Sequence, residues 1–436
     1  MSRITEVLNE EAARRNADSE AWDMTHETEE VVCRNGQADR RAAICASAVA
    51  LTVWRDGREG YAAQSPATGT SLVDMALAVG QALGSGASSG TNPPRPSPGP
   101  ASRQLTLPRL SLDDGHASDR LASLTTSFPA EIELRARVDQ YRVDLHRAGT
   151  EPLTYASGTF RLQAQATVRA GRVGFASHQM SGRAAERVMT RAEQEDLPEL
   201  ARLASVLASE PVRDLSYDHM LLDGRVVAAL LSLAIPAFQL DSVLEGRSRL
   251  ARRSGEQVGA RGLWLADDPA SADSPLLIPW DDEGTECGPT VLLQDGVLQG
   301  FLSSRRTAAA HGSPSTGSGR RGTAGEMPTV QHGFLVLRHA TSLGHDPRED
   351  GTVLYVAQAN GAHTSNSITG NFSVGANAVV VSPGHELNAG KITLAGNVFD
   401  LLRSIEGHDG RVRVSGSNRS FVATPGLWVT GLVVGR

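Results

Sequence analysis

The chain has 436 residues, of which 40% are hydrophobic and 21% are charged, and its 42 basic and 49 acidic side chains give a net charge of −7. This composition is typical of an ordinary globular protein, and the length exceeds what one hydrophobic core usually fills, so we expect two or three domains. The acidic balance argues against direct nucleic-acid binding as the main role, because a phosphate-binding surface is basic.

The cysteines and the N-terminus indicate the compartment. Cys33, Cys45 and Cys287 are odd in number and lack metal-ligand spacing, which fits a reducing environment. Residues 1–20 lack a basic start followed by an apolar stretch, so they do not form a secretory signal. The longest apolar run, 226–238, is too short for a membrane span and contains a proline. We therefore expect a cytoplasmic protein without membrane contact.

The first elements in chain order are a helix, a strand cluster and a second helix. Apolar residues at helical spacing predict a helix at 3–16, and Ser71 is placed as the N-cap of another at 71–83. Between them, residues 20–65 are strand-like around the turn Arg55-Asp56-Gly57. Residues 84–103 are almost all Gly, Ser, Pro and Ala, which predicts a flexible loop or linker.

Long strands follow at 131–178, where apolar and polar residues alternate, and a helix follows at about 182–208. Residues 57–62 and 171–176 share the pattern Gly-Arg-x-Gly-aromatic-Ala. This echo has two interpretations: two similar turns that enter strands, or a duplicated half-domain.

From residue 219 the pattern changes to short strands with defined turns. The apolar run at 226–238 predicts a helix, Asp295-Gly296 predicts a hairpin, residues 312–328 form a second polar loop, and 394–406 predicts a helix. The fold class is therefore α+β in two domains. Residues 1–215 form an N-terminal domain with a mixed sheet and helices, and residues 216–436 form a β-rich C-terminal domain.

Three short segments match known functional motifs, but the surrounding sequence argues against each of these functions. Residues 86–90 match the GxSxG nucleophile elbow but lie in the Gly/Ser/Pro tract, where no strand-to-helix turn is expected. Residues 317–322 match GxGxxG without a surrounding βαβ unit. Residues 384–391 resemble a phosphate loop with one spacer residue too many and Ile392 in place of Ser or Thr.

Histidine spacing argues against a zinc site within this chain. A zinc peptidase helix needs two histidines one turn apart and a glutamate that activates water. His26-Glu27 and His385-Glu386 both lack the downstream histidine, and no cysteine pair compensates. We therefore expect no metal or other cofactor in this chain.

Two polar groups are candidates for substrate binding. The cluster at 363–376, which includes His363, Asn371 and Ser373, is either a surface turn or a peptide-binding edge. Arg320 and Arg321 are either a solvated pair or a carboxylate clamp.

The ordered features resemble the TldD/PmbA family, also called modulator of DNA gyrase proteins. The segments that carry the resemblance are LEGRSRLARRSGEQVGARGLWLADDP (244–269), PWDDEGTECGPTVLLQDGVLQGFLSSRRTAA (279–309), STGSGRR (315–321), SITGNFSVGANAVVVSPGHE (367–386) and KITLAGNVFDLLRSI (391–405).

The resemblance implies a role without a catalytic metal. Catalytic members carry an HExxxH helix before the segment that here begins at Leu244, whereas residues 226–238 hold neither His nor Glu. The family's third ligand, a cysteine near the C-terminus, is absent from 417–429. This pattern is that of the TldE/PmbA branch. The sequence departs from the family at Asn371, where Asp is usual, and in its proline-rich tract at 85–100.

The resemblance therefore implies a heteromeric TldD-type metallopeptidase that processes peptides or peptide-like amides. In it, a TldD-like HExxxH-bearing subunit holds the zinc, and this chain closes the active-site chamber and holds the substrate. Two alternatives are a specialised amide or peptide hydrolase subunit in natural-product biosynthesis, and a stand-alone binding or regulatory protein.

Overall fold

The computed structural model describes residues 3–65, 71–83, 104–112, 115–322, 326–342, 348–349, 351–361 and 365–435. The predicted loop at 84–103 lies outside these residues. The N-terminal half contains, in chain order, α1 (Arg3–Arg14), β1 (Asp18–Arg34), β2 (Gln37–Arg55), β3 (Arg58–Gln64), α2 (Ser71–Leu83), β4 (Gln104–Thr106), α3 (Gly115–Leu124), β5 (Glu131–Arg147), β6 (Leu153–Ala170), β7 (Arg172–Gly182), α4 (Ala185–Arg191), a π-helical turn (Ala192–Asp196) and α5 (Leu197–Leu207).

The C-terminal half is built mainly from short strands. It contains β8 (His219–Leu222), α6 (Gly224–Leu231), a 3-10 turn (Ile235–Phe238), α7 (Leu240–Leu244), β9 (Leu263–Asp267), β10 (Thr290–Gln294), β11 (Val297–Leu298), α8 (Arg305–His311), β12 (Gly319–Arg320), β13 (Thr329–Val330), β14 (Phe334–His339), β15 (Val353–Asn360), β16 (Asn371–Ser382), β17 (His385–Asn397), α9 (Val398–Arg403), β18 (Ile405–His408), β19 (Arg413–Ser417), β20 (Ser420–Thr424), β21 (Leu427–Val429) and β22 (Val433–Gly435). The predicted α+β class is confirmed.

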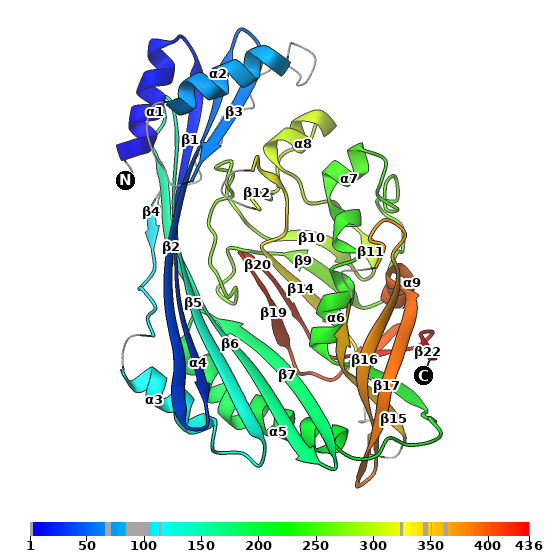
Figure 1. Ribbon diagram of the computed structural model, residues 1–436. Helices are drawn as coiled ribbons and strands as arrows, with labels where there is room; N and C mark the ends of the chain where they lie inside the picture. Colours follow the sequence, from blue (N-terminus) through cyan, green and yellow to red (C-terminus); the bar gives the residue numbers. More distant parts are fainter. Residues whose placement is uncertain are drawn as a thin grey trace.

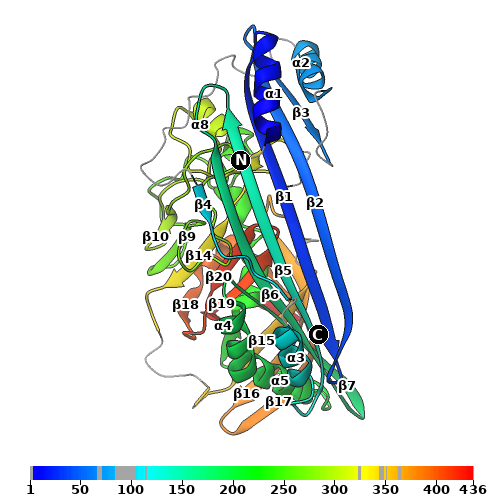
Figure 2. The same cartoon turned by 90° about the vertical axis from the view of Figure 1, so that its left-hand side faces the viewer.

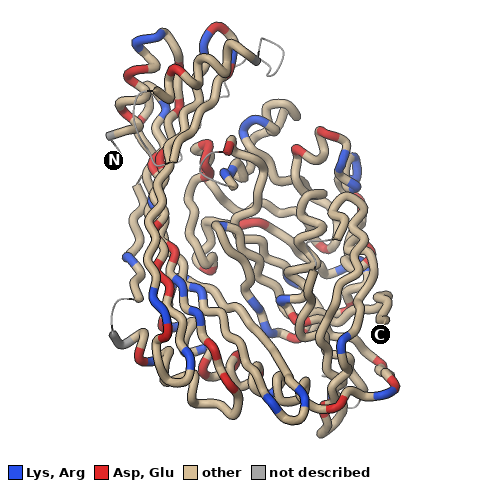
Figure 3. Tube along the Cα trace, in the orientation of Figure 1, with Lys and Arg blue, Asp and Glu red and all other residues tan. Residues whose placement is uncertain are grey.

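A long curved sheet forms the N-terminal half. Its strand order is β3-β2-β1-β5-β6, and β4 and β7 both pair with β6. Figure 1 shows this sheet curving around the C-terminal half, and Figure 2 shows its strands running almost the full length of the molecule. Acidic and basic side chains both occur along these strands (Figure 3), as expected for a sheet with one solvated face.

The two halves of this sheet repeat one arrangement. A helix, three antiparallel strands and a second helix occur first as α1, β1–β3 and α2, and again as α3, β5–β7 and α5. The repeated Gly-Arg-x-Gly pattern occurs at the same position in both repeats, at the start of the third strand. Gly57 and Gly171 both have positive φ at the turn before the third strand, and Gly60 and Gly174 lie where a helix crosses that strand. The structure favours the duplicated half-domain over two unrelated turns.

Gly60→Ala and Gly174→Ala are each expected to lower the free energy of unfolding by about 1–3 kcal/mol, because a methyl group would overpack the helix crossing. A Cβ at Gly60 would lie 1.8 Å from the Ala76 carbonyl oxygen, and one at Gly174 would lie 1.9 Å from that of Ala204. Urea unfolding followed by circular dichroism measures the loss. Gly375→Ala is the matched control, because no atom lies within 4 Å of its built Cβ. Equal midpoints for all three variants would contradict this account of the crossings.

Two further sheets fill the C-terminal half. One has the order β11-β10-β9-β14-β20-β19 and the other β18-β21-β8-β15-β16-β17-β22. Helix α6 packs against β15 of the second sheet and against β19 and β20 of the first. An apolar core that includes Leu230, Leu265 and Leu354 fills the space between them.

The two halves share buried side chains. One core joins the N-terminal sheet and α5 to Leu221, Val379 and Trp428, and a second joins Trp22 to Phe421. The halves therefore pack through continuous apolar cores. The boundary near residue 215 stays a prediction.

Two predicted helices differ in extent. Helix α6 begins before the run at 226–238 and ends at Leu231. Tight turns and a 3-10 turn follow, because Pro236 lacks the N–H that a continued helix needs. The helix expected at 394–406 is only Val398–Arg403. The side chain of Asn397 caps it at the Phe399 N–H, and the preceding residues stay paired in β17. In the described part of the chain, no helix is both long and apolar enough to cross a membrane.

Candidate functional site

Helix α6 is the element that the family resemblance equates with the zinc-binding helix. Asp223 is its N-cap and accepts a hydrogen bond from the Arg225 N–H at 2.9 Å. Its eight residues, GRVVAALL, include no His, Asp, Glu or Cys, and six of them are buried. These residues do not fit a zinc site on α6, since zinc needs nitrogen, sulfur or carboxylate ligands.

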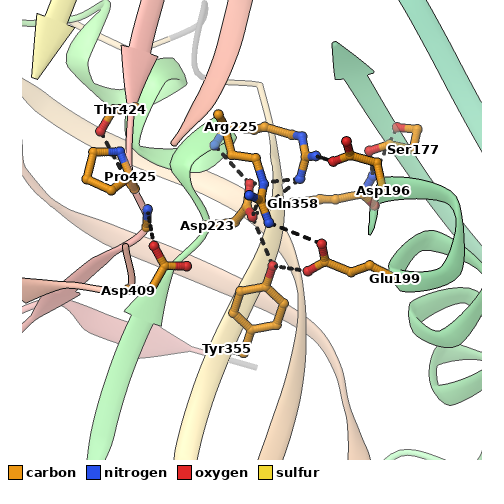
Figure 4. Close-up of polar contacts among 12 residues, drawn as sticks. Ser177, Asp196, Glu199, Asp223, Arg225, Tyr355, Gln358, Asp409, Thr424 and Pro425 are labelled. Carbon is orange, nitrogen blue, oxygen red and sulfur yellow. Dashed lines mark hydrogen bonds and ion pairs between the residues drawn. The ribbon is translucent and has the colours of Figure 1, made fainter. Parts of the chain in front are cut away.

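A buried network of charged side chains surrounds the N-terminal end of α6 (Figure 4). Arg225 binds Asp196 at 2.8 Å and Asp223 at 3.2 Å. The Tyr355 hydroxyl lies within hydrogen-bond distance of two carboxylates, 2.9 Å from Asp223 and 3.1 Å from Glu199, and its single hydrogen can be donated to either. Because Asp196 and Glu199 come from the N-terminal half and the others from the C-terminal half, the network joins the two halves beside α6.

His178, Asp196 and Glu199 form the one group of three His, Cys, Asp or Glu, within the described ranges, whose side-chain atoms lie within 4.8 Å of one another. Both ring nitrogens of His178 lack a hydrogen-bond partner, and burial together with Arg225 holds the pKa of His178 well below its ordinary value. Arginines already bind the two carboxylates, Arg225 at 2.8 Å and Arg413 at 3.2 Å. The two guanidinium groups would repel a divalent cation bound here, so the group fits an ion-pair network better than a metal centre.

A second buried polar cluster lies around residues 281–283. The Asp281 carboxylate accepts main-chain hydrogen bonds from Glu283, Thr285 and Gly319. Asp282 accepts two bonds from the Arg419 guanidinium at 2.7 and 2.9 Å. The Arg321 N–H also donates to Asp282 at 2.8 Å, so the acidic turn binds the main chain at the first residue of β12 and just after its end.

Arg419 reaches this cluster from a strained turn. Asn418 and Arg419 are the two turn residues between β19 and β20, and both have positive φ. This conformation costs a non-glycine residue about 1–2 kcal/mol. Arg419 also donates to the Tyr155 hydroxyl of β6 at 2.7 Å, so the hairpin tip binds the N-terminal sheet.

The two predicted arginines differ in their surroundings. Arg320 is 1% exposed, and its guanidinium faces the Gly317 and Gln331 carbonyl oxygens and the Cys287 sulfur. Arg321 stacks over the rings of Trp22 and Tyr61, with its guanidinium carbon 4.8 and 5.3 Å from the ring centres. Arg320 is therefore an interior residue.

Arg321 lies on the wall of a pocket between the N-terminal sheet and this cluster. The pocket has a volume of about 270 Å³. Its lining comprises Trp22, Met24, His26, Ala46, Ser47, Ala48, Ser65, Tyr141, Arg321, Gly322, Asn418 and Arg419. Concave sites with apolar walls and a few convergent polar groups are the usual form of small-ligand sites, so this pocket is the candidate functional site.

The other predicted residues lie elsewhere. Asn371 and Ser373 are exposed at the start of β16, and the Asn371 side chain accepts a hydrogen bond from Asn397 at 2.7 Å. Residue His363 lies outside the described residues. In the described part of the molecule, no hydrogen bond or ion pair joins Asn371 or Ser373 to Arg320 or Arg321.

Residues 216–436 match the family model described as the PmbA/TldA metallopeptidase C-terminal domain. The chain belongs to the PmbA/TldD family. The segments quoted for the resemblance all lie within this match, and they include both the 281–283 turn and the arginine pair.

Named relatives and solved structures agree with this placement. An uncharacterised protein of Methanocaldococcus jannaschii is 29% identical over 218 residues, 48% of this chain and 50% of that protein. Metalloprotease PmbA of Escherichia coli O157:H7 is 27% identical over 183 residues, 42% of this chain and 38% of that protein. The chain thus spans about half the length of these relatives or less.

The fold matches over nearly the whole chain. TldE from Thermococcus kodakarensis has a TM-score of 0.82 at 18% identity, covering 99% of this chain and 100% of that one. A Thermotoga maritima protein described as a modulator of a DNA gyrase has a TM-score of 0.79 at 21% identity, covering 99% of both chains.

Proposed function

We propose that this chain is the subunit of a heteromeric PmbA/TldD-type metallopeptidase that does not hold the catalytic zinc. The observation that carries the proposal is α6, an apolar helix without a ligand side chain, in a chain whose fold matches TldE over its whole length. The zinc would belong to a TldD-like partner that bears HExxxH, where a metal-activated water attacks a peptide or peptide-like amide.

The role proposed for this chain is to close the active-site chamber and hold the substrate. Arg321 has the position that best supports substrate binding, because it lines the pocket. Asn371 and Ser373 keep a proposed role in strand addition, since β15 pairs with β16 only from Gly375 onward. The free cysteines support a reducing compartment, and we place the complex in the cytoplasm.

The test is to purify the chain alone and co-expressed with its TldD-like neighbour. Zinc content and peptide hydrolysis are then measured on both preparations. We expect stoichiometric zinc and hydrolysis only in the co-purified complex. Zinc and activity in the lone chain would overturn the proposal. A stable homodimer that does not bind the TldD-like protein would instead support a stand-alone binding role.

A further inference from the structure

The pocket beside Arg321 is lined by basic side chains and, among the described residues, by no aspartate or glutamate. Of its two arginines, Arg419 is already paired with Asp282, which leaves Arg321 as the arginine of the lining without a direct carboxylate partner. A concave surface lined by one sign of charge favours a ligand of the opposite sign. We infer that this pocket binds the C-terminal carboxylate of a peptide, an inference that rests on the proposed peptidase role.

The Arg321 guanidinium has no direct carboxylate partner among the described residues. Its Nη1 donates to the Tyr61 hydroxyl at 2.7 Å and to the Glu326 main-chain oxygen at 2.8 Å, which are neutral acceptors. Arg321 is only 7% exposed, and its buried Nε has no hydrogen-bond partner among the described residues. The carboxylate of Asp282 is near enough for the Arg321 charge to lower its pKa, but both of its oxygens are bound by Arg419, so the Arg321 guanidinium can still accept a direct anionic partner.

The nearby acids are already engaged by other donors. Asp282 is bound on both oxygens by Arg419, and Asp281 accepts main-chain N–H groups. Glu20 is bound on both oxygens by Arg305 at 2.7 and 2.8 Å. These three carboxylates are therefore not free to pair with Arg321. The Glu326 carboxylate lies beside Gly322, and only the main chain of Glu326 accepts a hydrogen bond from Arg321, so a ligand carboxylate would add a direct partner for the guanidinium.

The walls fit an organic carboxylate better than a free inorganic anion. Trp22 and Tyr141 contribute aromatic surface, and the His26 ring stacks on Tyr141 with the ring centres 4.3 Å apart. His26 is held in this position by Asp139, whose carboxylate lies 2.8 Å from its Nε2. The volume of about 270 Å³ is close to the lower limit of small-ligand pockets, ~300 Å³, which suits the last residues of a peptide.

A strand edge next to the pocket favours a peptide over a small acid. Strand β3 pairs with β2 only from Val49 to Arg55. In the described part of the chain, no strand pairs with the same edge of β2 from Gln37 to Ala48, and Ala46, Ser47 and Ala48 line the pocket. An extended peptide added to this edge would form main-chain hydrogen bonds, with its carboxyl end directed into the pocket.

Calorimetric titration of the purified full chain, and of the co-purified complex, tests the inference. The probes are acetyl-Ala-Ala-Ala-Phe with a free carboxylate, the same peptide as its amide, acetyl-Ala-Ala-Ala-Glu amide, and inorganic phosphate. We expect the free acid to bind roughly tenfold or more tightly than its amide, because the amide cannot form a charge-assisted pair with Arg321. Arg321→Gln should abolish this preference, and Arg321→Lys should retain part of it.

Arg338→Gln is the matched control, because Arg338 also stacks on a tryptophan, Trp264, at 5.3 Å but does not line the pocket. Thermal unfolding of each variant separates lost binding from lost folding, and we expect the midpoint of Arg321→Gln to stay near that of the parent chain. Equal binding of acid and amide in both preparations overturns the inference, as does tighter binding of the Glu amide or of phosphate. Binding by the lone chain needs no zinc, so this result is independent of the test of the subunit role.

Discussion

Arg419→Met is expected to lower the free energy of unfolding by about 3–5 kcal/mol, because it leaves Asp282 as a buried charge without its partner. Asp282 is fully buried, and both of its oxygens bind the Arg419 guanidinium. Burial raises the pKa of Asp282, but the charge and hydrogen bonds of Arg419 outweigh it and hold that pKa below its ordinary value. Urea unfolding at pH 7 measures the change.

A double-mutant cycle separates the ion pair from other losses. Asp282→Asn with Arg419→Met removes both charges, so the double variant should be more stable than the sum of the single losses predicts. Arg419→Gly should lower the free energy of unfolding by about 1 kcal/mol less than Arg419→Met does, since glycine adopts the positive φ at this turn without strain. Additive losses across the cycle would show that the pair contributes little.

Local patterns predict much of this fold. The helices at α1 and α2, the long strands of the first sheet and the hairpin at Asp295-Gly296 follow from apolar spacing and turn residues, because those signals act within a few positions of the chain. The errors in the extents of α6 and α9 have different causes, one local and one that depends on strand pairing. Pro236 limits the first helix, while the second starts late because residues 394–397 pair with β16 and residues 394–395 also pair with β22.

The pocket is harder to predict because its residues are distant in sequence. The arginine pair is visible as a charged feature in a polar loop, but sequence alone does not distinguish the interior Arg320 from the pocket-lining Arg321. Trp22 and His26 lie in β1, about 300 residues before Arg321, and nothing in the local sequence distinguishes them from other strand residues. Arg419 occupies a two-residue hairpin turn, where glycine is preferred, and this unusual residue is the sequence signal that could have singled it out.

The parent protein is expected to lose stability as the pH rises from about 4.5 to about 7.5, and Glu283→Gln is expected to remove this loss. Burial and the charge of Asp281 raise the pKa of Glu283 to about 7, although Arg305 opposes this. The folded protein therefore holds a proton that the unfolded chain releases near pH 4.3, so stability falls as pH rises through this range and is constant above it.

The size of this effect is on the order of 3 kcal/mol at pH 8. Glutamine keeps an oxygen for the Arg305 N–H, which Glu283 now accepts at 2.6 Å, so the α8 N-terminus should remain intact. Urea unfolding from pH 4.5 to 8 should give similar stabilities for parent and variant at the acid end and a more stable variant at the basic end. Glu286→Gln, at an exposed carboxylate in the same loop, is the control. If the Glu283→Gln and parent curves run parallel, then Glu283 does not hold a proton in the folded state.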